Sequence, residues 1–159
     1  MEIILGEVFD KEIVLAMPVM AFLGTVEGSK PRVAPVWFLW EDAALWMLGD
    51  KSGSSVKRIS ENPECAVEIV HFDVANGVLL HLGLRGRAVV EKSDPQKFRR
   101  LLGKYLGDDH LNWNKWFIKN VARIEDEDGR MIKLIPESFF TNDVSYFRTG
   151  PDLANFEVD

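Results

Sequence analysis

The sequence has few of the residues from which disulfides and metal centres are built. Among its 159 residues there is one cysteine, Cys65, and there are three histidines, His71, His81 and His110. One cysteine excludes an intrachain disulfide, and its apolar surroundings in Cys65–Val67 favour a buried, inert thiol. No two histidines have the helical spacing of metal ligands, so we predict no metal site.

Positive charge and long apolar runs are also scarce. The 19 Lys and Arg residues are outnumbered by 25 Asp and Glu residues, which gives a formal net charge of −6. Binding to nucleic acid phosphates needs a broad positive field, so we expect no nucleic acid partner. No apolar run approaches the roughly 18 residues of a membrane span, and the first residues lack a basic segment before an apolar one. We therefore expect a cytoplasmic protein with no membrane partner.

Several common enzyme motifs are absent. The sequence has no Gly-x-Ser-x-Gly elbow, no phosphate loop ending in Gly-Lys-Ser or Gly-Lys-Thr, and no Gly-x-Gly-x-x-Gly turn. These absences argue against the usual serine hydrolases, P-loop enzymes and Rossmann enzymes.

Short segments rich in Val, Phe and Trp dominate what is present, and they predict a mainly β fold with a few helices. The expected strands are 19–26, 31–40, 44–48, 64–72, 78–91 and 130–135. The expected helices are 9–17, one over 54–59 that stops before Asn62–Pro63, 95–106, and a second helix after Gly107 containing Trp113, Trp116, Phe117 and Val121. We interpret residues 1–159 as a single domain, with a barrel core at about 19–91 and 130–140 and a helical insert at about 94–122.

The segment Pro31–Trp40 is apolar on both of its alternating faces. An antiparallel strand of this kind needs cover on both sides. This pattern favours a barrel whose outer wall is covered by a ligand, a helix or a second subunit.

A local group of basic residues and serines is the main candidate for a binding site. Its members are Arg32, Lys51, Ser54, Ser55, Lys57 and Arg58. We expect Ser54 to cap a helix whose N-terminal amides and partial positive charge suit a phosphate monoester. On the plainer interpretation, Ser54 only caps the helix while Lys57 and Arg58 point to solvent. The nearby Pro35–Trp37 segment offers an apolar and aromatic wall, and the combination indicates a phosphorylated aromatic cofactor.

Residues 19–91 resemble the flavin-binding split barrel of the pyridoxamine 5′-phosphate oxidase-like superfamily. The matching segments, in order, are Gly24–Val26, Pro31–Phe38, Leu45–Leu48, Ser52–Arg58, Asn62–Pro63 and Leu84–Ala88. The resemblance implies a six-stranded antiparallel split barrel that binds FMN at the interface of a homodimer. The cofactor-binding residues that it implies, by position, are Arg32, Pro35, Val36, Trp37, Leu48, Gly49, Lys51, Ser54, Ser55 and Lys57. Among these, Arg32 and Lys57 would hold the phosphate.

The function implied by the resemblance is an FMN-dependent oxidoreductase with a small-molecule electron donor and acceptor. The alternatives are a deazaflavin-dependent reductase and a non-catalytic flavin or haem binder. The Arg-Leu-x-Pro type substrate motif of the true oxidase is absent, the nearest text being Lys133–Pro136, so we do not expect oxidation of pyridoxamine phosphate. No catalytic residue is assigned, although His71 near Asp73 is a candidate proton donor and the tail 146–148 a candidate ring cap.

Overall fold

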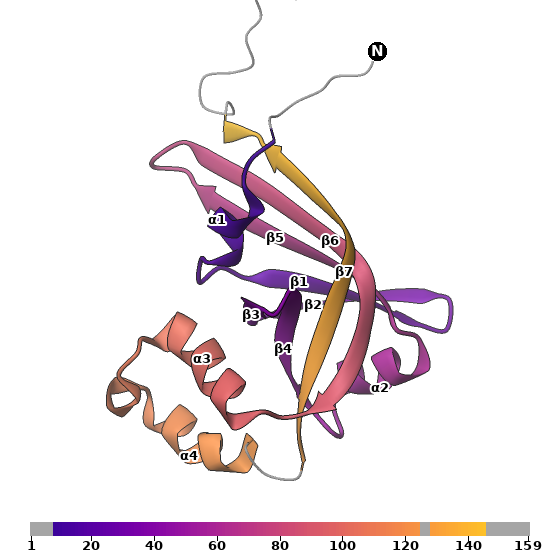
Figure 1. The fold of residues 1–159 in the computed structure, drawn as a ribbon, viewed down its shortest axis with the longest axis vertical. Coiled ribbons are helices and arrows are strands. Elements are labelled where there is room, and N and C mark those ends of the chain that lie inside the picture. The colour runs from indigo at the N-terminus through magenta and orange to yellow at the C-terminus, as the bar shows by residue number, and fades with distance from the viewer. Residues whose placement is uncertain (1–7, 125–127, 146–159) are drawn as a thin grey trace, which may run out of the picture.

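The chain forms one antiparallel sheet that curls around a hydrophobic interior (Figure 1). The computed structural model describes residues 8–124 and 128–145. Within these ranges seven strands are hydrogen-bonded in the order β2-β1-β5-β6-β7-β4-β3. The strands are β1 (Ala21–Glu27), β2 (Lys30–Val36), β3 (Phe38–Glu41), β4 (Ala44–Asp50), β5 (Glu64–Asp73), β6 (Val78–Lys92) and β7 (Gly129–Asp143). The helices are α1 (Lys11–Leu15), α2 (Ser54–Glu61), α3 (Pro95–Leu106), the 3₁₀ turn η1 (His110–Asn112) and α4 (Lys115–Ile124).

The mainly β, antiparallel prediction is confirmed, but the predicted number of six strands was wrong. The segment 31–40, predicted as one strand, is interrupted at Trp37 and gives both β2 and β3. These two strands lie at opposite edges of the sheet although only one residue separates them in sequence. Because one residue spans only about 3.5 Å, the two edges must approach each other. The sheet is therefore bent into a barrel that its hydrogen bonds leave open.

Side chains from both faces of β4 are buried, and they belong to two different hydrophobic clusters. The first fills the barrel interior, where Leu45 and Met47 pack with α1 and α2. The second lies outside the barrel, where Trp46 packs under α3 and η1. In Figure 1, α3 and α4 lie side by side at one end of the sheet, on the opposite side from α2. The helical insert thus supplies the outer cover of β4.

The outward face of β2, in contrast, is not covered by the described residues. The side chain of Val33 in the middle of β2 is 70% exposed, whereas Leu45 in β4 is fully buried. The sequence pattern predicts that both faces of 31–40 are covered. In the described part of a single chain, the outward face of β2 is left uncovered.

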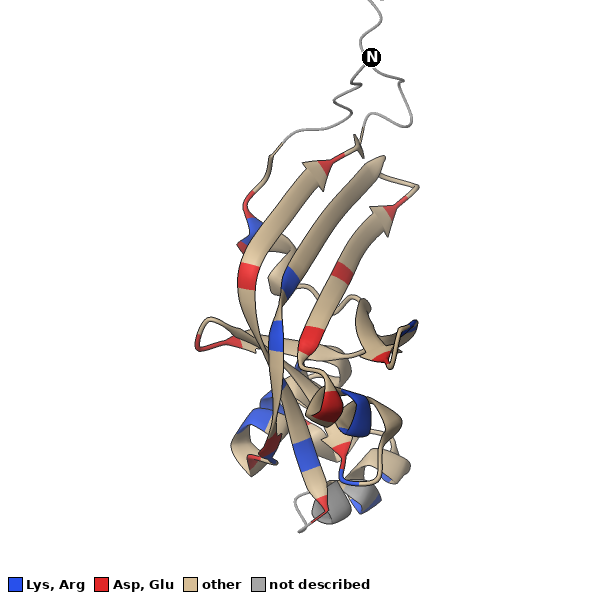
Figure 2. Ribbon diagram, turned by 90° about the vertical axis from the view of Figure 1, so that its right-hand side faces the viewer, with Lys and Arg blue, Asp and Glu red and all other residues tan. Residues whose placement is uncertain are grey.

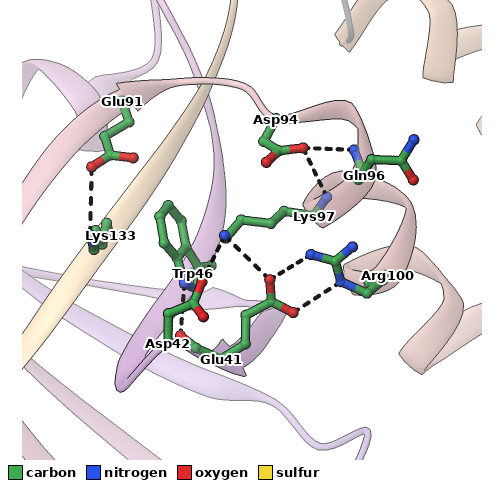
Figure 3. Close-up of polar contacts among 9 residues, drawn as sticks. All are labelled: Glu41, Asp42, Trp46, Glu91, Asp94, Gln96, Lys97, Arg100 and Lys133. Atoms are coloured by element: carbon green, nitrogen blue, oxygen red, sulfur yellow. Dashed lines mark hydrogen bonds and ion pairs between the residues drawn. The ribbon is translucent and has the colours of Figure 1, made fainter.

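Helix α3 is fastened to the turn between β3 and β4 by the polar contacts drawn in Figure 3. The Glu41 carboxylate accepts hydrogen bonds from Arg100 Nε at 3.0 Å and Nη2 at 2.6 Å, and it forms an ion pair with Lys97 Nζ at 3.3 Å. The Arg100 guanidinium holds the pKa of Glu41 below its usual range. The amines of Lys97 and Lys133 lie 4.4 and 5.0 Å from the centroid of the Trp46 ring, which favours both cations.

The helices follow the sequence predictions except in the length of α1, the position of Trp113 and the N-cap of α2. Helix α3 begins as expected, with the Asp94 carboxylate accepting from the amides of Gln96 and Lys97 ahead of its first turn. The first helix is shorter than the predicted 9–17. It begins at Lys11, because the Asp10 side chain caps it by accepting from Glu12 N, and it ends at Leu15. Trp113 lies outside α4, contrary to expectation, because its indole nitrogen donates to Gly107 O at 2.7 Å and holds it beside η1.

Basic residues are concentrated in the lower half of the molecule as drawn in Figure 2, around the helices and the lower ends of the strands. At the upper tips of the long strands the charged residues drawn are acidic. None of the helices that the structure describes is long and apolar enough to cross a membrane.

Candidate functional site

The start of α2 leaves backbone amides available for a ligand. Gly53 is the N-cap, with no side chain bonded to the first turn, and Gly53 O accepts the first helical hydrogen bond from Lys57 N at 3.1 Å. The prediction that Ser54 caps this helix was therefore wrong, and Ser54 is the first helical residue instead. The reason is the tight turn after β4, in which Gly53 N donates to Asp50 O at 2.8 Å and starts the helix one residue early.

Arg58 and Arg32 both lie beside one buried threonine next to this helix start. Arg58 Nε donates to Thr25 Oγ1 at 2.8 Å, and its Nη2 donates to Ser55 Oγ at 3.3 Å. Thr25 is 3% exposed and pairs directly across the β1–β2 ladder with Arg32. Residues opposite each other in an antiparallel pair project from the same face, so Arg32 leaves the sheet on the side of Thr25 and α2. The structure thus brings Arg58 to Thr25 across 33 positions of sequence, on the face of the sheet from which Arg32 also projects.

Arg32 already has an anionic neighbour within its own hairpin. Its Nε and Nη2 lie 2.8 and 2.7 Å from Glu27 Oε2, and both side chains are about half exposed. Exposed pairs of this kind contribute little, about 0–1 kcal/mol. An incoming phosphate therefore competes with a weak, solvated partner rather than with a buried one.

The remaining basic and hydroxyl candidates are exposed. Ser54, Lys51 and Lys57 have exposed side chains, for which the described residues provide no side-chain hydrogen bond or ion pair. The backbone amide of Lys51 donates to Asp128 O at 3.0 Å, which ties the loop after β4 to the start of β7. The structure therefore places Lys57 on the first turns of α2 but does not bring it into contact with Arg32.

The residues expected along a planar ring are largely occupied by packing within the chain. The Trp37 ring stacks on Tyr105 at 4.6 Å and on Phe117 at 5.8 Å between centroids. Val36 packs partly against the barrel interior, while Pro35 is exposed.

Leu48 and Gly49, expected beside a ribityl chain, have structural roles in β4. Leu48 packs against the cluster under α3. A Cβ on Gly49 would lie 2.8 Å from Val56 Cγ2, so glycine is required here for α2 to approach the sheet. Their predicted contact with a cofactor stays a prediction.

Sequence reasoning missed a polar clamp at the point where β2 gives way to β3. Tyr105 Oη accepts from Phe38 N at 3.1 Å and donates to Val19 O at 2.8 Å, and Lys104 Nζ donates to Phe38 O and Leu15 O. Burial lowers the pKa of Lys104 to about 7 and raises that of Tyr105 to about 12. The sequence shows Tyr105 only as part of an apolar helix stripe, so no local signal identifies the clamp.

The histidine candidates lie on opposite faces of the sheet. His71 pairs with Leu80, whose side chain is buried in the barrel, whereas His81 pairs with Val70 on the outward side. Asp73 accepts two hydrogen bonds from Asn76, which lower its pKa. The tail 146–148 lies outside the described residues. Within the described ranges no three His, Cys, Asp or Glu residues are grouped as metal ligands.

The chain matches no family model and no curated protein, but its fold matches solved structures. An F420 reductase is 22% identical, the match covering 84% of this chain and 98% of that one, with a TM-score of 0.63. A Listeria innocua protein described as a candidate pyridoxamine 5′-phosphate oxidase is 19% identical over 82% of this chain and 93% of its own, with a TM-score of 0.59. An FAD-binding protein from Mesorhizobium loti is 15% identical over 83% and 89%, with a TM-score of 0.57. At these identities the likeness shows that this chain has their fold.

Proposed function

We propose that this chain, which has the split-barrel fold of the pyridoxamine 5′-phosphate oxidase-like superfamily, is an FMN-binding oxidoreductase that works as a homodimer. The observation that carries the proposal is the position of Arg32 and Arg58 beside Thr25, with the Arg58 side chain reaching back from the last turn of α2 to Ser55 in its first turn, which lacks a side-chain cap. Neighbours of the same fold are described as an FAD-binding protein and an F420 reductase, which supports a flavin-type cofactor.

The phosphate of FMN fits the chemistry of this helix start. Two guanidinium groups offer several charge-assisted donors, and the amides of the first turn of α2 add a partial positive charge. Arg58 retains unused N–H donors, since Thr25 and Ser55 occupy only two of its five. Lys57 and Lys51 are exposed nearby on α2 and its loop, and both can turn toward a dianion. We therefore add Arg58 to the phosphate ligands that the sequence predicts.

A second copy of the chain is the cover that we propose for the outward face of the sheet. Phe22, Val33 and Phe140 are exposed there around the small residues Gly24 and Gly83. In a two-fold dimer the same patch meets itself, so a face with apolar residues at its centre suits self-association. The flavin would then lie where β2 of one subunit meets its partner.

When bound, the flavin supplies the electron or hydride transfer, and the chain's own residues hold it and limit access to it. Arg32, Arg58 and Lys57 fix the phosphate end, and the backbone of Val36 and Trp37 faces the ring. The stack of Trp37 on Tyr105 and Phe117 keeps this backbone in place. No side-chain nucleophile is needed for this chemistry.

The visible spectrum of the purified protein tests the proposed cofactor. We expect flavin absorption in the protein as isolated, or after titration with FMN, with the FMN released on denaturation. The test then compares FMN with riboflavin, F420 and haem. Saturable binding of F420 or haem without binding of FMN would contradict the proposal, and the corresponding alternative would replace it.

Stopped-flow reduction with nicotinamide donors tests the proposed activity separately. We expect at least one donor to reduce the bound flavin. A flavin that no donor reduces would leave the chain a flavin-binding protein and contradict the oxidoreductase assignment.

A further inference from the structure

A cleft of about 520 Å³ lies between α3 and the segment formed by η1 and α4. It lies on the helical insert, whereas the proposed phosphate site lies at α2 and the β1–β2 hairpin. Clefts between about 300 and 1,000 Å³ are the usual size for small organic ligands. Its lining comes from α3, from the turn that follows α3, and from η1 and α4.

The lining divides into a basic wall and an apolar wall. Arg99 and Arg100 come from successive positions of α3, while Trp113, Ile118 and Val121 come from the η1–α4 side. Trp113 is held in place by its hydrogen bond to Gly107 O, and Ile118 is 41% exposed. A ligand with an acidic group at one end and an apolar body matches this division.

The guanidinium of Arg100 is oriented in advance. Its Nε and one Nη2 hydrogen are occupied by Glu41, which leaves three N–H donors. The third guanidinium nitrogen faces away from Glu41 (Figure 3). An arginine already fixed by one carboxylate loses little further side-chain freedom when it binds a second anion. Lys104 contributes only its stem, because its amine donates to Leu15 O and Phe38 O.

Gly103 keeps the cleft open at the cost of helix stability. A glycine inside a helix destabilises it by about 1 kcal/mol relative to alanine. Among the described residues, apart from the backbone of its own helix, the one atom that a Cβ on Gly103 would meet within 4 Å is Asp108 Oδ1, at 3.9 Å, so no close packing in this part of the chain requires glycine. The missing side chain therefore widens the space between α3 and α4.

We propose that this cleft binds a small organic carboxylate, with the acid against Arg100 and an aromatic or aliphatic body against Trp113, Ile118 and Val121. Guanidinium and carboxylate groups match in planar geometry, which favours a carboxylate over a neutral polar group. Asp108 is the acidic residue of the lining, and it opposes this ligand by like-charge repulsion.

The test uses the full-length protein at pH 7.5 and naphthalene-2-carboxylate as the probe, with naphthalene-2-methanol as its uncharged analogue. Isothermal titration calorimetry should show one saturable carboxylate site per chain and at least about tenfold weaker binding of the alcohol, the loss expected for a charge-assisted hydrogen bond. Amide shifts in a ¹⁵N spectrum should be concentrated in α3, η1 and α4. Equal binding of acid and alcohol, or shifts confined to the barrel, would overturn the proposal.

Three substitutions make the expectation specific. Gly103→Leu fills the cleft and should abolish binding of the carboxylate. Gly103→Ala is its matched control and should bind the carboxylate within about twofold of the natural protein. The melting temperature of both variants should be no lower than that of the natural protein. Asp108→Asn should bind the carboxylate several-fold more tightly. Unchanged binding by Gly103→Leu, or weaker binding by Asp108→Asn, would contradict the assigned position. None of these residues contacts the proposed FMN site, so FMN affinity reports separately on that proposal.

Discussion

At the scale of single residues, the proposed FMN site depends on a few cations that differ in their surroundings. Arg58 is held by Thr25 and Ser55, Arg32 is paired with Glu27, and Lys57 is exposed. A ligand must therefore reorganise Lys57 and displace Glu27 from Arg32, whereas Arg58 is already in place.

Lys57→Ala should weaken FMN binding about tenfold, since a charge-assisted bond to phosphate contributes about 1.5 kcal/mol or more. Arg32→Ala should behave alike. Riboflavin lacks the phosphate, so its affinity should hardly change, and fluorescence titration of the two ligands provides the control. Equal weakening of FMN and riboflavin would place Lys57 away from the phosphate.

Glu27→Gln should have the opposite effect on FMN. The substitution frees Arg32 from its carboxylate partner and removes a negative charge near the proposed phosphate. We expect a several-fold lower dissociation constant for FMN and no change for riboflavin. Tighter binding of neither ligand would indicate that Arg32 does not reach the phosphate.

Lys104 should make the protein more stable as the pH rises from about 7 toward 10. Burial lowers its native pKa to about 7, below the ordinary lysine value of 10.5, so in this range the unfolded chain binds more protons at Lys104 than the native chain does. The contribution is at most about 1.4 kcal/mol per pH unit. In urea unfolding at pH 7, 8 and 9, the natural protein should gain stability relative to Lys104→Met. Parallel pH profiles would contradict a buried, largely neutral amine.

At the scale of elements, the β3–β4 hairpin has a strained turn and supports α3. Asp42 and Ala43 have φ of 55° and 53°, the left-handed conformation of a two-residue type I′ turn. Glu41, the residue before the turn, pairs with Arg100 and Lys97 on α3 (Figure 3). The position of α3 over β4 therefore depends on the geometry of this turn.

Ala43→Gly should raise the free energy of unfolding by about 0.5–1 kcal/mol, because glycine adopts a positive φ without a steric penalty. Ala44→Gly, one residue later in β4, is the matched control. Ala44 is 1% exposed and in an extended strand, so its replacement should destabilise the chain. Chemical denaturation of both variants checks the pair, and destabilisation by Ala43→Gly would contradict the assigned turn.

At the scale of the whole molecule, the proposed dimer depends on the residues that the outward face of the sheet exposes. Glu68 lies there in a hollow, its Oε2 3.2 Å from where a Cβ of Gly83 would be, and burial raises its pKa. His81 and Arg85 lie on the same face of β6, so the patch contains both signs of charge. A patch of this kind can complement itself across a two-fold axis.

Phe140→Asp should therefore shift the protein from dimer to monomer and release FMN, because the proposed site needs both subunits. Phe140 is 59% exposed on this face and is not part of the hydrophobic core, so the substitution should leave the fold of the single chain intact. Leu111→Asp, at a position 75% exposed on η1, is the control and should remain a dimer. Sedimentation velocity gives the mass. A natural protein that sediments as a monomer would contradict the proposed assembly.

Much of the fold follows from local pattern. The alternation in 78–91 predicts a strand with one core face, and β6 buries Leu80, Leu82 and Leu84 as expected. The order Asp94–Pro95 correctly predicts the start of α3. The sequence also shows the group of basic residues around Ser54 and Ser55. It does not show which of these side chains contact one another.

Sequence by itself therefore determined the β class, most of the elements and the composition of the proposed phosphate site, because periodicity and capping act within a few residues. Tertiary structure alone decided the break at Trp37, where Tyr105 binds Phe38 from 67 positions away, and the meeting of Arg58 with Thr25 across 33 positions. Contacts of this range depend on how the sheet curls and where the helical insert packs. Those outcomes depend on the packing of the whole core, and no local pattern encodes them.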